Sequence, residues 1–449
     1  MNIIYIHTHD TGTYIQPYGH QVPTPNLMKL AKEGLVFRQM YSAAPTCSAS
    51  RSAMMTGMSP HSCGMNGLAH RGFRLHDYEQ HMASWFRKAG VDTVLCGIQH
   101  EAPDREMIGY SQILNAPYKL DQSVESLAEM DRHHASLAAD FIQQSHERPF
   151  FLSLGLYQTH REFPQVSPAS AHYVTPPFPL YDSPQNRTDM AAYIESAKGM
   201  DDCVGIVLRA LESAACRADT LVVFSTDHGL AFPRMKCNLL DTGIKVAFMV
   251  RFPDGHRQGE VSDALVSQID VFPTFCQWLG VDSPPWLQGS SMMPLMNGEV
   301  DVIRDHCFAE VSYHAAYEPM RMIRSKRYKL IRRYDHLAHR IAANIDDSVS
   351  KDFLVEHGYL KGTEPSDMLF DLYMDPVERV NVREQEDYRE VYEDLSQRLD
   401  RWMEETADPL QYHPVVPLPK QAVVNRQDAI SPNERLTDVW PEESAYSDK

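Results

Sequence analysis

Short apolar segments alternate with longer amphipathic segments through the first 280 or so residues of the chain. The apolar segments, each bounded by turn-forming residues, are 3–6, 93–96, 150–154, 221–225 and 246–251. Between them, apolar residues recur at helical spacing in 26–33, 78–89, 127–144, 190–213 and 266–279. Apolar strands that alternate with helices predict an α/β fold, in which helices sandwich a mainly parallel sheet.

The pattern changes after about residue 300. Segments 308–311, 320–323, 328–332 and 367–373 have the character of short strands, and 388–403 has that of a helix. A Ser-Lys-Arg turn at 325–327 joins two of these strands, which predicts a smaller α+β subdomain with an antiparallel sheet and a packed helix. We therefore expect a catalytic domain at 1–300, this subdomain at 301–407 and a tail at 408–449.

The tail is polar, contains prolines and carries Trp440 near its end. Such a segment can wrap over the body of the protein or over a neighbouring subunit of a homo-oligomer, and it can equally be disordered. The pattern favours none of these alternatives over the others.

Composition narrows the class of protein. A chain of 449 residues can bury a large core. The formal charge of −18 and the lack of a basic run argue against a nucleic-acid binder. We find no basic leader at the N-terminus and no apolar stretch approaching the roughly 20 residues of a membrane span. The eight cysteines show no paired spacing, so we expect a reduced, cytoplasmic protein.

Polar residues directly follow two of the predicted strands. His9 and Asp10 follow the first strand, and Asp227 and His228 follow the strand at 221–225. Ligands of parallel sheets bind beyond the carboxyl ends of the strands, so these residues are expected to lie together. Carboxylates and imidazoles in such a group predict a divalent metal site, with His7 as a competing ligand or a supporting residue.

A second candidate site is the segment Pro-Thr-Cys-Ser-Ala-Ser-Arg at 45–51. Ser48 or Ser50 is expected to cap a short helix that runs to Gly57. Cys47 would then lie at the positive end of that helix, and Arg51, one turn later, would bind an anion. The alternative is a buried structural cysteine beside a surface arginine.

This segment resembles the signature of the sulfatase family, Cys-x-Pro-x-Arg or Cys-x-Ala-x-Arg followed by Thr-Gly. The resemblance implies an alkaline-phosphatase-like fold and oxidation of Cys47 to formylglycine, whose hydrated aldehyde attacks sulfur. Ala49 stands where proline is commoner. That variant implies a formylglycine-generating maturation enzyme of the radical, oxygen-independent type.

The resemblance also implies a ligand set for the metal. Asp10, Asp227 and His228 match positions that bind it in the family, and the formylglycine from Cys47 completes the set. His9 stands where a second aspartate is usual. Calcium is the ion that the family implies, but His9 adds a nitrogen and removes a charge, so Mn²⁺ and Mg²⁺ stay open.

Further catalytic residues follow from the same resemblance. His100 matches the histidine that takes a proton from the formylglycine hydroxyl, but Ile98 replaces the lysine that the family usually has two residues earlier. His160 matches the histidine that donates to sulfate or to the leaving group. Lys236 is the predicted sulfate-binding residue of a later segment, and Arg234 is the alternative to it. Arg161 is predicted to supply the positive charge that is lost at Ile98. The predicted contacts to the sugar are His314, Glu318 and Arg321.

Together the motifs predict a metal-dependent sulfatase that cleaves a sulfate ester or a sulfamate of a small sulfated sugar, and they look most like the sulfamidase (N-sulfoglucosamine sulfohydrolase) branch. A phosphonate or phosphate ester hydrolase of the same superfamily is one alternative. The other is a noncatalytic binder of sulfated ligands, which the departures at His9, Ala49 and Ile98 suggest.

Overall fold

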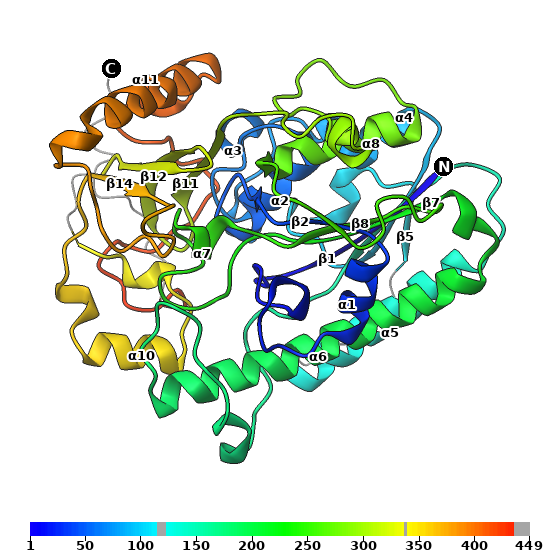
Figure 1. Ribbon diagram of the computed structural model, residues 1–449, viewed down its shortest axis with the longest axis horizontal. Helices are drawn as coiled ribbons and strands as arrows, with labels where there is room; N and C mark the ends of the chain where they lie inside the picture. The colour runs from blue at the N-terminus through cyan, green and yellow to red at the C-terminus, as the bar shows by residue number, and fades with distance from the viewer. Residues whose placement is uncertain (115–122, 336–338, 435–449) are drawn as a thin grey trace.

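A central sheet of eight strands organises the N-terminal part of the molecule (Figure 1). The computed structural model describes residues 1–114, 123–335 and 339–434. In the sheet the strands follow the order β5-β4-β6-β1-β7-β8-β2-β9. Their bounds are β1 (Asn2–Thr8), β2 (Leu35–Phe37), β4 (Asp92–Gly97), β5 (Gln112–Leu114), β6 (Phe150–Gly155), β7 (Thr220–Thr226), β8 (Phe248–Arg251) and β9 (Glu260–Ser262). Among the described strands of this sheet, only β8 runs antiparallel to its neighbours, so the predicted mainly parallel sheet is confirmed.

Helices cover both faces of this sheet, as Figure 1 shows. Ile4 and Ile6 of β1 belong to a core cluster shared with α1, α5 and α6. Ile3 and Tyr5, on the opposite face, pack in a cluster with α2, α4 and α8. The bounds are α1 (Pro25–Lys32), α2 (Cys47–Thr56), α4 (Met82–Lys88), α5 (Val124–Ile142), α6 (Pro184–Ser213) and α8 (Val271–Leu279). Because both faces are covered, β1 is buried at every position, and its central residues 3–6 are all apolar.

The elements expected from the pattern are present, with two differences in the helices. The segment predicted as one helix at 266–279 contains the two-residue strand β10 (Val266–Ser267), which pairs with β3 (Met40–Tyr41), and a short turn before α8. The segment at 78–89 divides at His81, whose side chain accepts a hydrogen bond from the Ala83 amide and caps α4.

A second sheet of four antiparallel strands lies beside the first. Its strands are β11 (Cys307–Tyr313), β12 (Tyr317–Arg324), β13 (Tyr328–Arg333) and β14 (Asp367–Asp371). One face packs against Tyr41, Leu239 and Ile244 of the N-terminal part, and the other face packs against α11 (Arg389–Glu405). The predicted α+β unit is therefore confirmed, while its exact boundaries stay a prediction. The short helices α3 (Pro60–Cys63), α7 (Asp241–Ile244), α9 (Met293–Met296) and α10 (Val349–Glu356) complete the named helices.

The polar tail packs on the body of the protein as far as residue 434. Val416 and Val424 are buried in a cluster with Met65 and Phe73. The Asn425 amide donates to the Ala315 carbonyl, which adds a backbone contact to this packing. Residues 435–449, including Trp440, lie outside the described residues. Among the helices of the described chain, none combines the length and the apolar character that crossing a membrane requires.

Candidate active site

The predicted metal-binding residues lie together at the ends of two neighbouring strands. β1 and β7 are parallel, and Thr8 pairs with Thr226 at their carboxyl ends. His9 and Asp10 therefore emerge beside Asp227 and His228, and the Asp10 amide donates to Asp227 Oδ1 at 2.9 Å. Asp10 adopts φ 51°, a left-handed conformation that Asp and Asn tolerate better than most residues. The prediction that these side chains meet at one edge of the sheet is confirmed.

Four possible metal ligands converge at this edge. Ligand atoms of His9, Asp10, Cys47 and Asp227 all lie within 4.8 Å of one another, and the four residues are buried. His228 Nε2 lies 3.3 Å from Asp10 Oδ1 and 3.3 Å from Cys47 Sγ. His9 Nε2 is buried and makes no hydrogen bond with the described residues. Two carboxylates and an unsatisfied imidazole nitrogen are a donor set that fits a divalent cation.

His7 supports Arg51 instead of joining this set. Its Nδ1 lies 2.5 Å from Arg51 Nη1, and its Nε2 lies 3.1 Å from the Ser153 hydroxyl. Arg51 Nη2 donates to the Thr8 carbonyl at 2.7 Å and lies 3.1 Å from Asp227 Oδ2. The guanidinium is thus fixed beside the carboxylates, which leaves a supporting role for His7 of the two that the sequence allowed.

Cys47 is the first residue of α2, as predicted, but the predicted capping is wrong. Thr46 occupies the capping position. Ser48 accepts a hydrogen bond from the Ala69 amide, and Ser50 donates to the Asp227 carbonyl and to Gln268, so tertiary partners hold both hydroxyls. The end of the helix is as expected, with Gly57 in the left-handed region at φ 69°.

The thiol of Cys47 is poorly suited to act unmodified. Burial raises its pKa well above the usual value, and the charges of Asp10 and Asp227 raise it further against the opposing effect of Lys236. A thiol with a raised pKa stays protonated near neutral pH, whereas the thiolate is the nucleophile. The unmodified thiol is therefore a poor nucleophile in this site.

His100 and His160 both lie close to His9. The ring centroids of these two residues are 4.5 and 5.6 Å from that of His9. His160 Nδ1 lies 2.5 Å from the Arg161 carbonyl, which directs Nε2 towards Asp10 at 4.0 Å. Burial, followed by the charge of Arg51, lowers the pKa of His100 well below its usual value. His100 is therefore neutral near pH 7 and able to accept a proton.

Two acidic residues near these groups were not expected from the sequence. Glu101 accepts a hydrogen bond from the His100 amide at 2.8 Å. Asp346, distant along the chain, lies beside Lys236, whose Nζ is 3.0 Å from Asp10 Oδ2 and 3.1 Å from Asp346 Oδ2. No strand end or motif marks Asp346, so only the tertiary structure identifies it.

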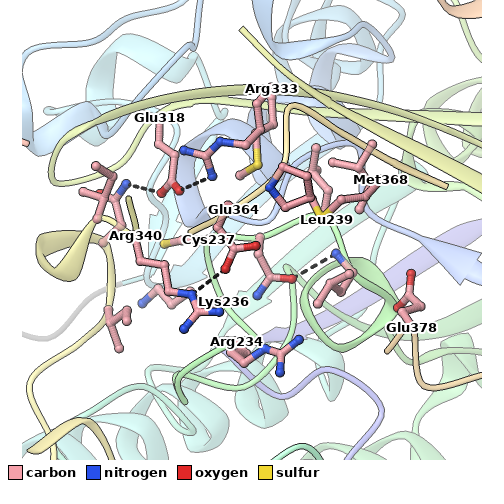
Figure 2. Close-up of a pocket in the computed structure, with 18 of the residues that line it drawn as sticks. Arg234, Lys236, Cys237, Leu239, Glu318, Arg333, Arg340, Glu364, Met368 and Glu378 are labelled. Atoms are coloured by element: carbon pink, nitrogen blue, oxygen red, sulfur yellow. Dashed lines mark hydrogen bonds and ion pairs between the residues drawn. The ribbon is translucent and has the colours of Figure 1, made fainter. Parts of the chain in front are cut away.

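Lys236 also lines a cavity of about 230 Å³ between its own loop and strands β12–β14 (Figure 2). Glu318 and Arg333 point towards each other across one wall and lie 3.1 Å apart, and the Asn344 amide donates to the same carboxylate. Arg234 lines the opposite side. Within the described chain its guanidinium has no ion-pair partner. Arg234 and Glu318 therefore stay candidates for contacts with a substrate.

Arg161 is paired inside the protein. Its Nη1 and Nη2 donate to the two carboxylate oxygens of Asp189 at 2.8 and 2.7 Å, and its Nε donates to the Ala231 carbonyl. A bidentate pair with a carboxylate balances the charge and fixes the side chain. Three of its five N–H donors are thus held inside the protein, and the substrate-binding role of Arg161 stays a prediction.

Arg321 is a correction. Its side chain is fully buried and bonds Asp408, while its Nε also lies 3.0 Å from a Glu310 oxygen. A side chain without exposed surface cannot contact a sugar, so the predicted substrate role is wrong. His314, by contrast, is buried, and its Nδ1 makes no hydrogen bond with the described residues. Burial lowers its pKa well below the usual value, and the charges of Lys236 and Asp346 act on this pKa as well. Its substrate role stays a prediction.

Comparison with known proteins decides the family. The profile described as Sulfatase matches residues 1–281. The chain belongs to the sulfatase family. A second profile, N-sulphoglucosamine sulphohydrolase, C-terminal, matches residues 228–346 of this sulfatase. Membership of the family makes the protein a sulfuric ester hydrolase.

Relatives of this sulfatase match it over most of its length. It is 26% identical to human N-sulphoglucosamine sulphohydrolase over 448 residues, which covers 86% of each chain. It is 27% identical to an ulvan-active sulfatase of Formosa agariphila over 476 residues, which covers 95% of this chain and 77% of the other.

Solved structures of low sequence identity share the fold. One is the complex of BT4656 with its substrate D-glucosamine-2-N,6-O-disulfate, with a TM-score of 0.70, 17% identity and coverage of 92% of this sulfatase and 99% of that chain. The phosphonate monoester hydrolase of Agrobacterium radiobacter has a TM-score of 0.68 at 18% identity, and the match covers 90% of this sulfatase and 96% of that chain. The fold is thus shared with a protein solved in complex with a sulfated sugar and with a phosphonate monoester hydrolase.

Proposed function

We propose that this sulfatase hydrolyses a sulfate ester or sulfamate of a small sulfated sugar. The observation that carries the proposal is the convergence of Cys47, Arg51 and the paired carboxylates Asp10 and Asp227 at one edge of the sheet. The match to the C-terminal profile of N-sulphoglucosamine sulphohydrolase and the human relative of that name support a sugar substrate.

Cys47 is the proposed site of formylglycine, made by a maturation enzyme of the radical type. His9, Asp10, Asp227 and His228 would hold a divalent cation beside it, with Ca²⁺ first and Mn²⁺ or Mg²⁺ as alternatives. The hydrated formylglycine would supply the nucleophile. The cation, when bound, would neutralise negative charge at the sulfate group. The raised pKa of the Cys47 thiol supports the need for this conversion.

Arg51 and Lys236 are the proposed sulfate-binding cations. The Arg51 guanidinium is held by Thr8, His7 and Asp227, so its donors are fixed before substrate arrives. Groups fixed in this way stabilise charge in a transition state without reorganising. Arg51 and Lys236 would also replace part of the positive charge that the family usually has at the position of Ile98.

The two histidines have complementary proposed roles. His160 directs Nε2 to the site and, when protonated, would donate to the leaving oxygen or nitrogen, with the Arg161 carbonyl holding the proton on Nδ1. His100, which stays neutral, would accept the proton from the nucleophilic group. His314, Arg234 and Glu318 are the proposed contacts to the sugar, since the last two line the cavity next to Lys236.

The proposal is tested by mass spectrometry of the peptide that contains Cys47, in protein from its native host, together with assays on sulfate esters, sulfamates and phosphate esters. We expect loss of the thiol as formylglycine and turnover of a sulfated sugar. Cys47→Ala should abolish that turnover, while Cys216→Ala, remote and only partly buried, should keep it.

Two outcomes would overturn this reading in different directions. Faster turnover of phosphate or phosphonate esters would favour the related hydrolase activity. Equal inactivity of mature wild type and Cys47→Ala towards a broad sulfated panel would favour a noncatalytic binder of sulfated ligands.

A further inference from the structure

Asp346 reaches the catalytic centre from the C-terminal part of the chain. It lies between β13 and α10, and its side chain is 18% exposed. Oδ2 is itself buried and makes no hydrogen bond that meets normal geometry within the described chain, yet it lies 3.1 Å from Lys236 Nζ. Asp346 therefore directs one carboxylate oxygen at a lysine of the proposed sulfate site.

Lys236 needs a counter-charge because it is almost completely buried. Its side chain is 3% exposed, and burying an ammonium group without a partner of opposite charge is strongly unfavourable. Asp10 and Asp346 both provide one. The carboxylate of Asp10, however, also belongs to the group of possible metal ligands, whereas Asp346 lies outside that group. Once a cation binds, only Asp346 is left as a carboxylate that serves Lys236 alone.

The segment directly before Asp346 is held by side-chain hydrogen bonds. The Asn344 side chain bonds Glu318 and the Ala316 amide, and Lys351 Nζ donates to the Ile345 carbonyl at 2.8 Å. These contacts fix residues 344 and 345, directly before the aspartate, against β12 and α10. A carboxylate on such a segment can hold a flexible lysine side chain in one direction.

We infer that Asp346 is a positioning residue, which holds the Lys236 ammonium for the sulfate group and keeps it from competing with the metal for Asp10. This inference rests on the proposed function. Without the Asp346 charge, Asp10 is the one carboxylate within the described ranges that is left in contact with Lys236. The ammonium then pairs with Asp10 more strongly, so both the metal and the sulfate group meet a less suitable site.

The test compares Asp346→Asn with Asp347→Asn. The neighbouring Asp347 is 43% exposed and pairs with Lys351, so it serves as a matched control. For Asp346→Asn we expect a fall in kcat of about 10- to 100-fold, the range for residues that orient a ligand, with a smaller change in KM. Calcium titration of the metal-free proteins should show affinity weakened by roughly 10-fold in the same variant. Asp347→Asn should match the wild type in both measurements, and Asp346→Glu should recover part of each loss.

Other results would overturn the inference. Calcium affinity and kcat within twofold of wild type in Asp346→Asn would show that Lys236 needs no such partner. Equal losses in Asp346→Asn and Asp347→Asn, accompanied by equal falls in melting temperature, would show a structural role only. If the wild type cleaved no sulfated compound, the proposed function would fail, while the calcium titration would still decide the role of Asp346.

Discussion

The sulfatase contains two buried clusters of similar composition that serve different ends. The catalytic cluster combines histidines and carboxylates with Arg51 and Lys236. The second cluster joins His61 of α3, Glu310 of β11, Arg321 of β12 and Asp408, which follows α11. Both contain a His and two carboxylates whose ligand atoms are close enough for a metal ion. Donor type and spacing alone therefore do not separate them.

The position of the arginine does separate them. Arg321 Nε contacts both Glu310 and Asp408, so a protein cation already occupies the space between the two carboxylates. In the catalytic cluster, Arg51 contacts Asp227 and Lys236 contacts Asp10, and each cation lies beside a single carboxylate of this pair. The second cluster is thus a closed ion network that joins distant segments, and the first retains room for an external cation.

Removing the central cation of the second cluster is the strongest way to test this comparison. Arg321→Met leaves Glu310 and Asp408 buried without their partner, so we expect the free energy of unfolding to fall by about 3–5 kcal/mol. Chemical denaturation measures this loss. The kcat of the molecules that remain folded should stay near the wild-type value.

The control is Arg398→Met. Arg398 is 45% exposed and pairs with Asp394 one helical turn away, so its loss should cost no more than about 1 kcal/mol. Equal stability of the two variants would contradict the closed-network interpretation of the Arg321 cluster.

Asp10→Asn should have the opposite signature, with activity lost and stability kept. We expect kcat/KM to fall by about 10²- to 10³-fold, the range for losing a group that stabilises charge in the transition state. Asparagine tolerates the left-handed backbone at this position, and Lys236 keeps Asp346 as its counter-charge, so the melting temperature should change little.

Activity assays, calcium titration and thermal melting check this prediction together. A variant that bound calcium as tightly as wild type would remove Asp10 from the metal site. If Asp10→Asn lowered the melting temperature strongly but left calcium binding intact, the catalytic cluster would have a structural role, like the Arg321 cluster.

His81 sharpens the comparison because it is a buried histidine outside both clusters. Burial lowers its pKa to about 3, below the usual 6.5. The unfolded chain takes up a proton as pH falls below 6.5, while the folded protein resists until about pH 3, so stability is lost on acidification across this window. His81→Asn keeps a capping group but removes the titration.

Between pH 6.5 and 4.5 the wild type should therefore lose about 2–3 kcal/mol more unfolding free energy than His81→Asn. Urea denaturation at a series of pH values measures the difference. Parallel pH profiles for the two proteins would show that His81 does not contribute to acid sensitivity.

Much of the fold could be predicted because buried parallel strands leave a strong signal. Segments such as 150–154 and 221–225 are apolar at almost every position and became β6 and β7. The three-residue strands β2, β5 and β9 carry too few residues for a pattern, and β9 lies at a partly exposed edge. Pattern thus identifies the centre of the sheet better than its margins.

The candidate site was predictable where chemistry follows a strand or a motif, as at Asp10, Cys47 and Asp227. The role of a charged residue was not predictable where its partner could be either a substrate or another residue of the protein. In the sequence nothing separates Arg161 and Arg321 from Arg51. The structure shows that Arg161 pairs with the buried carboxylate of Asp189 and that Arg321 pairs with that of Asp408. Asp346 was missed for the converse reason, since its partner lies about 110 residues away along the chain.

The burial of Cys47 has a consequence for the order of events during synthesis. Its side chain is only 3% exposed in the folded protein, so a modifying enzyme of the proposed kind must reach it while the segment is still extended. The residues that enclose the site arrive later, from Asp227 to Asp346. At translation rates of about 5–20 residues per second, the last of them follows Cys47 after roughly 15 to 60 s. Under the proposed modification, folding and modification of this chain would compete, and the interval before the site closes would set how much active enzyme a cell obtains.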